Sequence, residues 1–351
     1  MITRRDIKTL THQELFDTLT QDFKLPKFRV GQLEQWLWEK GAESFDQMTS
    51  FSKPLRGQLE ECFSLSVPKI AFRQESADGT RKYLMNFADG ANVETVGIPS
   101  RDFSRLTVCF STQAGCAMGC KFCATGWGGF SRNLSIGEMY DQVKLVGEDF
   151  GIRVTNIVAM GQGEPFANYT PVINALKLMN NQKALGIGAR HITVSTCGII
   201  SGIERFMHES EQFTLAVSLH SAIQSTRDEL MPGVAKQPLT DLYDALKTYG
   251  EFTKRRPSLE YALIDGVNDT PDHLDALIDF CRGMLCHVNL IPLNPIKEYS
   301  SDSQHYLMKP SNKLNNFKNI LNKVGIENSI RASRGGDIDG ACGQLIQNFK
   351  K

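Results

Sequence analysis

Short apolar stretches alternate with helical stretches between about Arg105 and Pro295, giving six strand–helix units. Such an alternation requires parallel strands joined by helices that lie outside the sheet. The stretches are apolar at most positions, as strands buried on both faces must be. The pattern fits a doubly wound sheet or an incomplete barrel, and in both folds the site lies at the carboxyl ends of the strands. The predicted strands are RLTVCFS, TNIVAMG, HITVST, FTLAVSLH, LEYALID and HVNLIPL.

Polar residues, cysteines and glycines directly follow several of these strands. Because parallel strands end at the same edge of a sheet, the residues that follow them are expected to line one site. They are Cys116, Cys120 and Cys123 after the first strand, then Gly163-Glu164, Ser195-Thr196, Ser218-Leu219-His220 and Asn294.

Four regions are predicted along the chain. The first has apolar side chains at helical spacing and is expected to be a helical accessory domain. The second contains strand-like runs separated by Asp-Gly turns, and the third is the strand–helix core. The regions are 1–65 (accessory domain), 66–100 (small β segment carrying Glu94), 101–296 (core) and 297–351 (C-terminal extension carrying Cys342).

Two helix starts in the core are predicted from capping signals. Ser135 and Glu138 have the spacing of a capping box, in which each side chain bonds the backbone of the other. Thr170 is expected to cap the following helix, with Pro171 at its first position.

The composition is ordinary for a globular protein, with 41% hydrophobic and 22% charged residues in a chain of 351. No apolar run reaches the roughly 18 residues of a membrane span. The polar, partly acidic N-terminus resembles neither a secretory signal nor a transit peptide, so a cytoplasmic location is expected. Because the formal net charge is zero, any surface that binds nucleic acid must be local. Residues 101–134, with four basic and one acidic side chain, are the candidate, and a solvated charged face is the alternative.

The spacing of three cysteines indicates a metal centre. The chain has nine cysteines, and an odd number without an export signal argues against a disulfide scaffold. Cys116, Cys120 and Cys123 form a C-x3-C-x2-C motif, which can hold three irons of a 4Fe–4S cluster and leave the fourth open. Zinc and a chance arrangement remain alternatives, although structural zinc sites usually have four protein ligands.

An open iron can be chelated by the amino and carboxylate groups of S-adenosylmethionine (SAM). One electron from the cluster then cleaves a carbon–sulfur bond of SAM and yields a 5′-deoxyadenosyl radical. Such a radical needs an enclosed site without water, which a barrel-like core can provide.

The segment STQAGCAMGCKFCATGWGGFSRNL resembles the RlmN family of dual-specificity RNA adenine-C2 methyltransferases. The N-terminal segment FRVGQLEQWLWEKGAESFDQMT resembles the accessory domain of that family. The resemblance implies an α/β fold: a radical SAM partial (βα)6 barrel with an N-terminal helical domain and a C-terminal extension. Further matching segments, in the family's order between Glu94 and Leu345, are MGQGEPFAN, ITVSTCGI, LAVSLHS, LEYALIDGVND, HVNLIPLNP and DIDGACGQL.

The resemblance implies a role for each candidate residue. Cys342 is the methyl-accepting cysteine, Cys109 forms a disulfide with it at the end of turnover, and Glu94 accepts a proton. Without the resemblance, both cysteines would be interpreted as structural thiols and Glu94 as an exposed strand residue. The implied cluster ligands are Cys116, Cys120 and Cys123, and the implied SAM-contacting residues are Gly163, Glu164, Ser195, Ser218, Leu219, His220 and Asn294.

Adenine C2 is not nucleophilic, so the implied mechanism uses two SAM molecules per turnover. The first methylates Cys342, and the second supplies the radical that activates the new methyl group for addition to the ring. The resulting adduct is resolved by Glu94 and Cys109. The implied substrates are 23S rRNA, at the peptidyl-transferase centre, and tRNA, next to the anticodon. A reductase such as flavodoxin or ferredoxin is the implied electron donor, and the protein is expected to be a monomer.

Two other functions remain open. The related enzyme Cfr, which methylates adenine C8, shares most of the motifs, and Pro165 favours the C2 enzymes. A non-catalytic iron–sulfur RNA-binding protein would need neither Glu94 nor Cys342. The chain departs from the family pattern at Gln162, where methionine is common, and at Gly340, where alanine is common, while Cys197 lies at a variable position. Gln162 is expected near the SAM site and could alter SAM binding.

Overall fold

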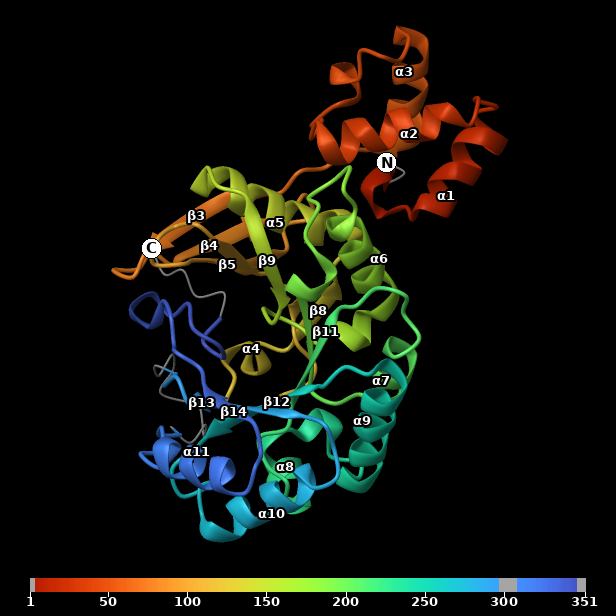
Figure 1. The fold of residues 1–351 in the computed structure, drawn as a ribbon. Coiled ribbons are helices and arrows are strands. Elements are labelled where there is room, and N and C mark those ends of the chain that lie inside the picture. Colours follow the sequence, from red (N-terminus) through yellow and green to blue (C-terminus); the bar gives the residue numbers. More distant parts are fainter. Residues whose placement is uncertain (1–3, 297–307, 346–351) are drawn as a thin grey trace.

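The computed structural model describes residues 4–296 and 308–345, and a ten-stranded sheet forms the centre of the molecule. Six neighbouring strands of this sheet are parallel and correspond to the six predicted from the sequence. Figure 1 shows them inside a layer of helices. They are β6 (Leu106–Cys109), β9 (Val154–Ala159), β10 (Ile192–Thr196), β11 (Thr214–Ser218), β12 (Ser258–Leu263) and β13 (His287–Pro292).

The strand order decides between the two predicted architectures. The order is β14-β13-β12-β11-β10-β9-β6-β5-β4-β3, so each parallel strand lies beside its neighbour in the sequence. A doubly wound sheet would instead reverse direction at a switch point. The predicted partial barrel is therefore confirmed. The strands added at the two edges are β14 (Asn328–Ile330) and the antiparallel β5 (Asn92–Pro99), β4 (Arg81–Asn86) and β3 (Lys69–Glu75).

Helices connect the parallel strands, and the two predicted helix starts have different outcomes. The capping box of Ser135 and Glu138 is confirmed. The predicted cap at Thr170 is wrong, because a 3-10 helix runs directly into the next helix and the cap position is Asn168. The Asn168 amide donates to the carbonyls of Thr112 and Leu134 instead. The helices are α5 (Ile136–Phe150), α6 (Tyr169–Asn180), α7 (Ile200–Phe206), α8 (Gln224–Leu230), α9 (Leu239–Thr253), α10 (Pro271–Cys281) and α11 (Leu314–Lys323).

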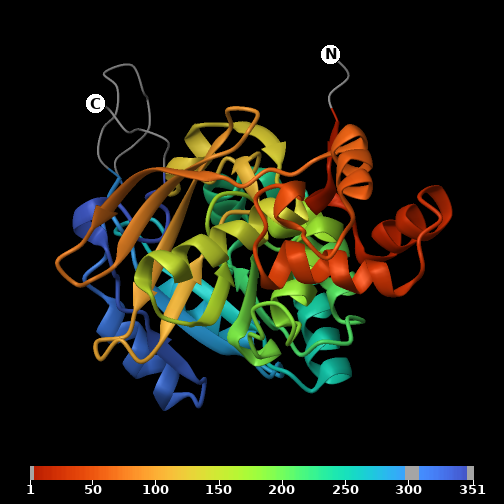
Figure 2. The same ribbon diagram turned by 90° about the horizontal axis from the view of Figure 1, so that it is seen from above.

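The N-terminal helices pack together beside the barrel, as Figures 1 and 2 show. They are α1 (His12–Asp17), α2 (Phe28–Glu34) and α3 (Lys53–Cys62), accompanied by the short parallel strands β1 (Arg5–Asp6) and β2 (Phe63–Ser64). At the junction, Lys8 forms a buried ion pair with Asp141 of α5 and lies 5.5 Å from the centre of the Trp38 ring. None of the helices within residues 4–296 and 308–345 has the length and hydrophobicity of a membrane span.

The segment that follows β14 crosses the open barrel to the opposite edge of the sheet. Arg334 donates to Asp78, in the turn between β3 and β4, at 2.8 Å. Farther along, the Leu345 carbonyl accepts a hydrogen bond of 2.7 Å from Thr125, which lies just beyond the cysteine motif. Residues 331–345 therefore cover the carboxyl ends of the strands, where the predicted site lies.

Candidate active site

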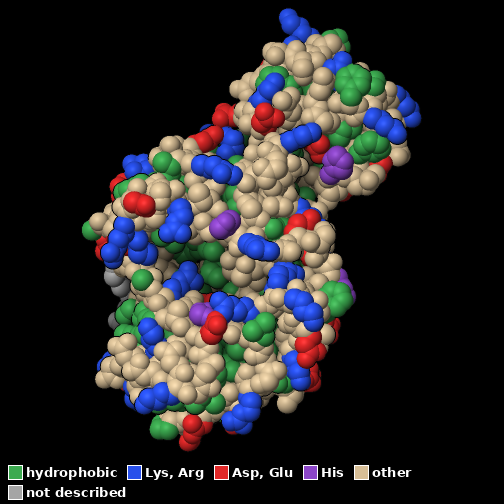
Figure 3. All heavy atoms as spheres, viewed as in Figure 1, with side chains coloured by type: hydrophobic (Ala, Val, Ile, Leu, Met, Phe, Trp, Pro, Cys, Tyr) green, Lys and Arg blue, Asp and Glu red, His purple; other side chains and the backbone are tan. Residues whose placement is uncertain are grey.

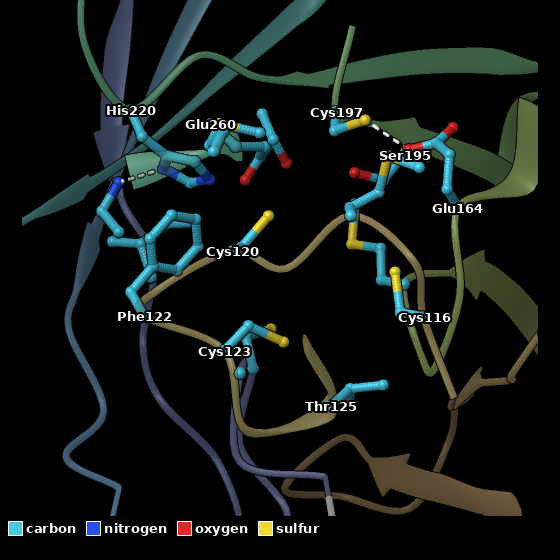
Figure 4. Close-up of a pocket in the computed structure, with 18 of the residues that line it drawn as sticks. Cys116, Cys120, Phe122, Cys123, Thr125, Glu164, Ser195, Cys197, His220 and Glu260 are labelled. Carbon is cyan, nitrogen blue, oxygen red and sulfur yellow. Dashed lines mark hydrogen bonds between the residues drawn. The ribbon is translucent and has the colours of Figure 1, made fainter. Parts of the chain in front are cut away.

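A cavity of about 170 Å³ opens at the carboxyl ends of the parallel strands. Strands β9 to β13, the cysteine loop and the C-terminal extension all contribute to its wall (Figure 4). Leu219, Cys109 and Glu94 are not among its lining residues. The predicted site residues that the fold brings together there are Cys116, Cys120, Cys123, Gly163, Glu164, Ser195, Ser218, His220, Asn294 and Cys342.

The cysteine loop lies between β7 (Gln113–Gly115) and α4 (Ala124–Trp127). Gly115 adopts a left-handed conformation with φ of +77°, and a Cβ atom there would lie 2.0 Å from the Gly129 carbonyl oxygen, so the start of the loop requires glycine. Figure 4 shows the three cysteine side chains pointing toward the cavity. Burial raises the pKa of each thiol, that of Cys116 to about 11, so a positively charged group is needed to hold them as thiolates.

The three thiols are arranged around a shared space. Among the described residues, no three His, Cys, Asp or Glu side chains converge as ligands of a single metal ion. The cysteines border the cavity at separate points, and the charge of Cys123 acts on both Cys116 and Cys120. This donor set fits a 4Fe–4S cluster, because each of the three thiolates would bind a different iron and the cavity offers room for a further ligand.

Glu164 forms the cavity wall at the end of β9. Its buried carboxylate accepts hydrogen bonds from the backbone N–H groups of Phe166 (2.9 Å) and Cys197 (2.7 Å). Gly163 permits the turn, since its φ is +103° and a Cβ atom would lie 2.8 Å from the Gln113 nitrogen. Burial raises the pKa of Glu164, and no Lys or Arg of the described residues forms an ion pair with it. A carboxylate in this setting suits the ammonium group of an amino acid or of SAM.

The opposite wall carries His220, which has a left-handed φ of +53°. Its Nδ1 accepts a hydrogen bond of 2.9 Å from the Ala262 backbone N–H. Burial lowers the pKa of His220 to about 3, so the ring is neutral at physiological pH. The ring also makes an edge contact with Phe122 of the cysteine loop, at 4.5 Å between ring centres. Leu219 is fully buried, and its backbone N–H donates to the Glu260 carbonyl at 3.0 Å.

The extension places Cys342 at the cavity. Asn294 donates from Nδ2 to the Cys342 carbonyl oxygen at 3.1 Å and accepts from Ser333 at 2.8 Å, so it joins β13 to the extension at two points. Cys109, the last residue of β6, is buried against Val96 and Leu345. Burial and, to a smaller extent, the charge of Cys342 raise the pKa of Cys109 to about 12, which locates the two thiols near each other.

Glu94 is completely buried in β5, so it is not an exposed strand residue. Its Oε1 lies 3.2 Å from the ammonium group of Lys82. Lys82 also donates to the carbonyl of Asp339 at 3.4 Å, three residues before Cys342. Glu94 therefore lies beneath the extension that carries Cys342.

Three of the cavity residues that were not predicted as site residues from the sequence carry a charged or thiol side chain. Glu260 lies in the middle of an apolar strand, and an acidic residue in such a position is a signal that could have identified it. Arg331 follows β14, and the charge of Cys342 raises the pKa of its guanidinium. Cys197 contributes through its backbone N–H to Glu164 and lines the cavity itself. The side chain of Gln162 is buried outside the cavity wall.

Basic side chains border a hollow on the face of the core seen in Figure 3. Two of the four basic residues in segment 101–134 are engaged in ion pairs. Lys121 lies 3.0 Å from Glu229, and Arg132 contacts both Asp89 (2.5 Å) and Glu138 (2.7 Å). Arg101 and Arg105 are exposed.

Comparison with known proteins agrees with this geometry. Residues 110–281 match the radical SAM superfamily, and residues 6–65 match the ribosomal RNA large subunit methyltransferase N-terminal domain. The chain is 42% identical over 346 residues to a protein of Clostridium novyi named as a dual-specificity RNA methyltransferase RlmN, with 98% of each chain covered. It is 46% identical to the protein of the same name from Trichodesmium erythraeum, over 91% of this chain and 90% of the other.

A solved structure has the same fold throughout. The crystal structure of a radical SAM methyltransferase from Sphaerobacter thermophilus superposes with a TM-score of 0.86 at 40% identity, covering 97% of this chain and 99% of that one. Membership of the radical SAM superfamily implies a 4Fe–4S cluster and SAM, which the donor set described above fits. The chain therefore belongs to the RlmN family of radical SAM RNA methyltransferases.

Proposed function

We propose that this protein methylates C2 of an adenosine in 23S rRNA and of an adenosine next to the anticodon in certain tRNAs, through a methylated cysteine. The observation that carries the proposal is the position of Cys342. The extension holds this exposed thiol at the cavity that Cys116, Cys120 and Cys123 line, with Cys109 behind it. Neither an electron carrier nor an RNA-binding protein needs such a second pair of thiols.

The first task of the chain is to hold the cofactors. Cys116, Cys120 and Cys123 would hold the cluster, and Glu164 would bind the amino group of SAM. The cluster supplies the electron that cleaves SAM to the 5′-deoxyadenosyl radical. Ser195, Ser218, His220 and Asn294, which line the cavity, orient SAM and exclude water from the barrel.

The second task is to carry the methyl group, and each turnover uses two SAM molecules. Cys342 accepts a methyl group and, after loss of one hydrogen atom from it, forms a carbon–carbon bond to adenine C2. Glu94 removes the proton from C2, from its position beneath the extension. The adduct must also give up one electron, for which the oxidised cluster would be the acceptor. Cys109, as the thiolate, then attacks the Cys342 sulfur. The sulfur–carbon bond breaks as the disulfide forms, and the released carbon takes up a proton to become the methyl group of the RNA. Burial, which raises the pKa of Cys109 to about 12, keeps this thiol protonated until the adduct is present.

The position of the new methyl group tests this proposal. The reconstituted protein, with SAM and a flavodoxin- or ferredoxin-type reductant, is incubated with protein-free 23S rRNA or tRNA, and the digested RNA is analysed by mass spectrometry. We expect 2-methyladenosine, and none with Cys342→Ala. A methyl group on C8 would assign the Cfr reaction instead. An intact cluster with no methylated adenosine would favour a non-catalytic iron–sulfur protein.

A further inference from the structure

We propose that Arg227 is a positioning residue that couples the cysteine loop to the strand ends that bind SAM, and that its charge raises the reduction potential of the cluster. The inference rests on the function proposed for this site, because it concerns the same cofactors. Arg227 lies on α8 and its side chain does not line the cavity.

One buried guanidinium joins the ends of two neighbouring strands. Arg227, only 3% exposed, donates from Nη2 to the Cys197 carbonyl, just beyond β10, at 2.6 Å. Its Nη1 donates to the carbonyls of Ser218 and Leu219, at the end of β11, both at 3.3 Å. Ser218 and Leu219 were predicted to contact SAM, and Cys197 lines the cavity, so Arg227 fixes the spacing of two strand ends at the proposed SAM site.

The same guanidinium is linked to Glu164 through the backbone of one residue, Cys197. The Cys197 carbonyl accepts from Arg227, and the Cys197 N–H donates to Glu164 Oε2 at 2.7 Å. Gly198 provides the space, because a Cβ atom there would lie 2.8 Å from Arg227 Nη2. Loss of Arg227 would therefore release the residue that orients the proposed ligand of the SAM amino group.

The end of α8 and the turn after it support the cysteine loop. The Leu230 carbonyl accepts from the Lys121 N–H at 3.0 Å, and the Gly233 N–H donates to the Met118 carbonyl at 2.9 Å. Between them, Met231 lines the cavity, and its sulfur lies 2.9 Å from Arg227 Nη1. Arg227 thus links the backbone that holds the cluster with the backbone that holds SAM.

The charge of Arg227 is not balanced by a direct ion pair. No Asp or Glu in the described part of the chain forms one with it, and the adjacent Asp228 accepts from Gln224 at 2.7 Å. Arg132, in contrast, lies between two carboxylates. Burial lowers the pKa of Arg227, while the charges of Cys197, Cys120 and the adjacent Asp228 raise it, so the guanidinium interacts electrostatically with a proposed cluster ligand. A nearby positive charge favours the reduced cluster, which carries one more electron.

Two substitutions separate the hydrogen bonds from the charge. Arg227→Lys keeps the charge but cannot bridge three carbonyls, and Arg227→Met removes both. The full-length, anaerobically reconstituted protein is used, with iron content and circular dichroism as checks of folding. SAM affinity is measured from the change in the EPR spectrum of the reduced cluster, and the midpoint potential from an EPR-monitored redox titration. Arg205→Met, which removes an exposed guanidinium from α7, is the matched control.

We expect Arg227→Lys to bind SAM about tenfold more weakly than the parent while its potential stays close to that of the parent. Arg227→Met should lose at least as much affinity and also have a more negative potential. SAM binding by Arg227→Lys at parental affinity would overturn the coupling, and an unchanged potential in Arg227→Met would overturn the electrostatic part. If Arg227→Met does not fold, a SAM affinity of Arg227→Lys equal to that of the parent still refutes the proposal.

Failure of the proposed function has a different signature. In that case the parent protein forms no methylated adenosine, although its cluster and SAM affinity respond to Arg227 as described. Methylation by the parent with no response to either substitution would refute the role of Arg227 alone.

Discussion

The proposed active site contains two groups of cysteines that the fold holds in different ways. Cys116, Cys120 and Cys123 lie in one short loop, and the local path of the chain brings them to the cavity. Cys109 and Cys342 are far apart in the sequence. They lie near each other because β6 ends beneath the segment that crosses the barrel from β14 to the turn between β3 and β4.

The two groups of cysteines therefore depend on different parts of the protein. The loop requires local features, such as the left-handed Gly115, and support from the turn after α8. The pair requires the extension to be docked at both ends, by Arg334 on Asp78 and by Leu345 on Thr125. Damage to the docking should therefore affect the chemistry of the pair while the cluster remains.

The largest effect is expected when the loop loses a cysteine. The parent protein, reconstituted anaerobically, should bind about four irons, because three thiolates at this spacing hold a 4Fe–4S cluster. Cys120→Ala should lose most of the iron and all RNA methylation. Iron analysis and the absorption spectrum measure the result, with Cys62→Ala in α3 as the exposed control. Stoichiometric zinc without a brown chromophore in the parent would contradict the assignment.

Substitution of the pair should abolish turnover in two distinguishable ways. Cys342→Ala removes the methyl acceptor, so neither S-methylcysteine nor a protein–RNA adduct should form. Cys109→Ala leaves the acceptor but removes the resolving thiol, so the adenine should remain bonded to Cys342. Protein purified from cells and treated with nuclease is examined on denaturing gels stained for nucleic acid.

Retention of RNA by only the Cys109→Ala protein would support the two roles. A purely structural pair would behave differently, because both alanine variants would then be mildly destabilised to a similar extent. Equal retention, or none in either variant, would remove the assignment of Cys109 and Cys342 and with it the covalent mechanism.

The two groups also differ in how far the sequence predicts them. Strand–helix periodicity predicted the parallel strands, and the cysteine spacing predicted the loop, because both are properties of neighbouring residues. Glu94 and Cys342 were identified by resemblance to a family, since no local pattern shows that Glu94 is buried beneath the extension. Residues such as Arg227 and Arg331 act across the fold, and only the packed structure reveals their partners. The cap predicted at Thr170 was wrong because the sequence did not reveal the 3-10 helix that precedes α6.

Glu164 is held both by a local turn and by a contact with a neighbouring strand end. Its substitution should have an intermediate effect, a loss of SAM affinity. Its carboxylate is placed by the local turn at Gly163 and by a hydrogen bond from Cys197, directly after the neighbouring strand β10. Glu164→Gln keeps the shape but removes the charge, which should weaken SAM binding by roughly 1.5–3 kcal/mol, or about ten- to hundredfold. The EPR change of the reduced cluster on titration with SAM measures this, with the exposed Glu204→Gln as control. Parental affinity in Glu164→Gln would show that another group binds the ammonium.

The Lys8–Asp141 ion pair joins the N-terminal helices to the barrel, far from both groups of cysteines. Its loss should destabilise the protein without changing the chemistry of either group. Lys8→Met leaves Asp141 buried without its partner and should destabilise the protein by about 3 kcal/mol near neutral pH. Burial raises the pKa of Asp141 to about 6. The contribution of this carboxyl to stability therefore falls as the pH rises from about 4 to 6. Asp141→Asn should remove that pH dependence. Thermal unfolding at several pH values measures both effects. The double variant Lys8→Met/Asp141→Leu should recover stability, and its failure to do so would show that packing, not the unpaired charge, causes the loss.

The smallest effect is expected at Gly340, where the family commonly has alanine, two residues before Cys342. Its φ is not left-handed, and a Cβ atom would lie 3.3 Å from the Gly335 carbonyl oxygen, so a small shift accommodates it. Gly340→Ala should change the free energy of unfolding by less than about 1 kcal/mol. In a Cys109→Ala background it should leave RNA trapping, the covalent retention of RNA on Cys342, unchanged. Gly335 is the matched control, because its φ is +65° and a Cβ atom would lie 2.9 Å from Thr80 Cγ2. Gly335→Ala should strain the docking of the extension, cost about 1–2 kcal/mol in thermal unfolding and reduce RNA trapping while the iron content stays constant. Equal behaviour of the two alanine variants would mean that the position of Cys342 does not depend on how the extension crosses the barrel.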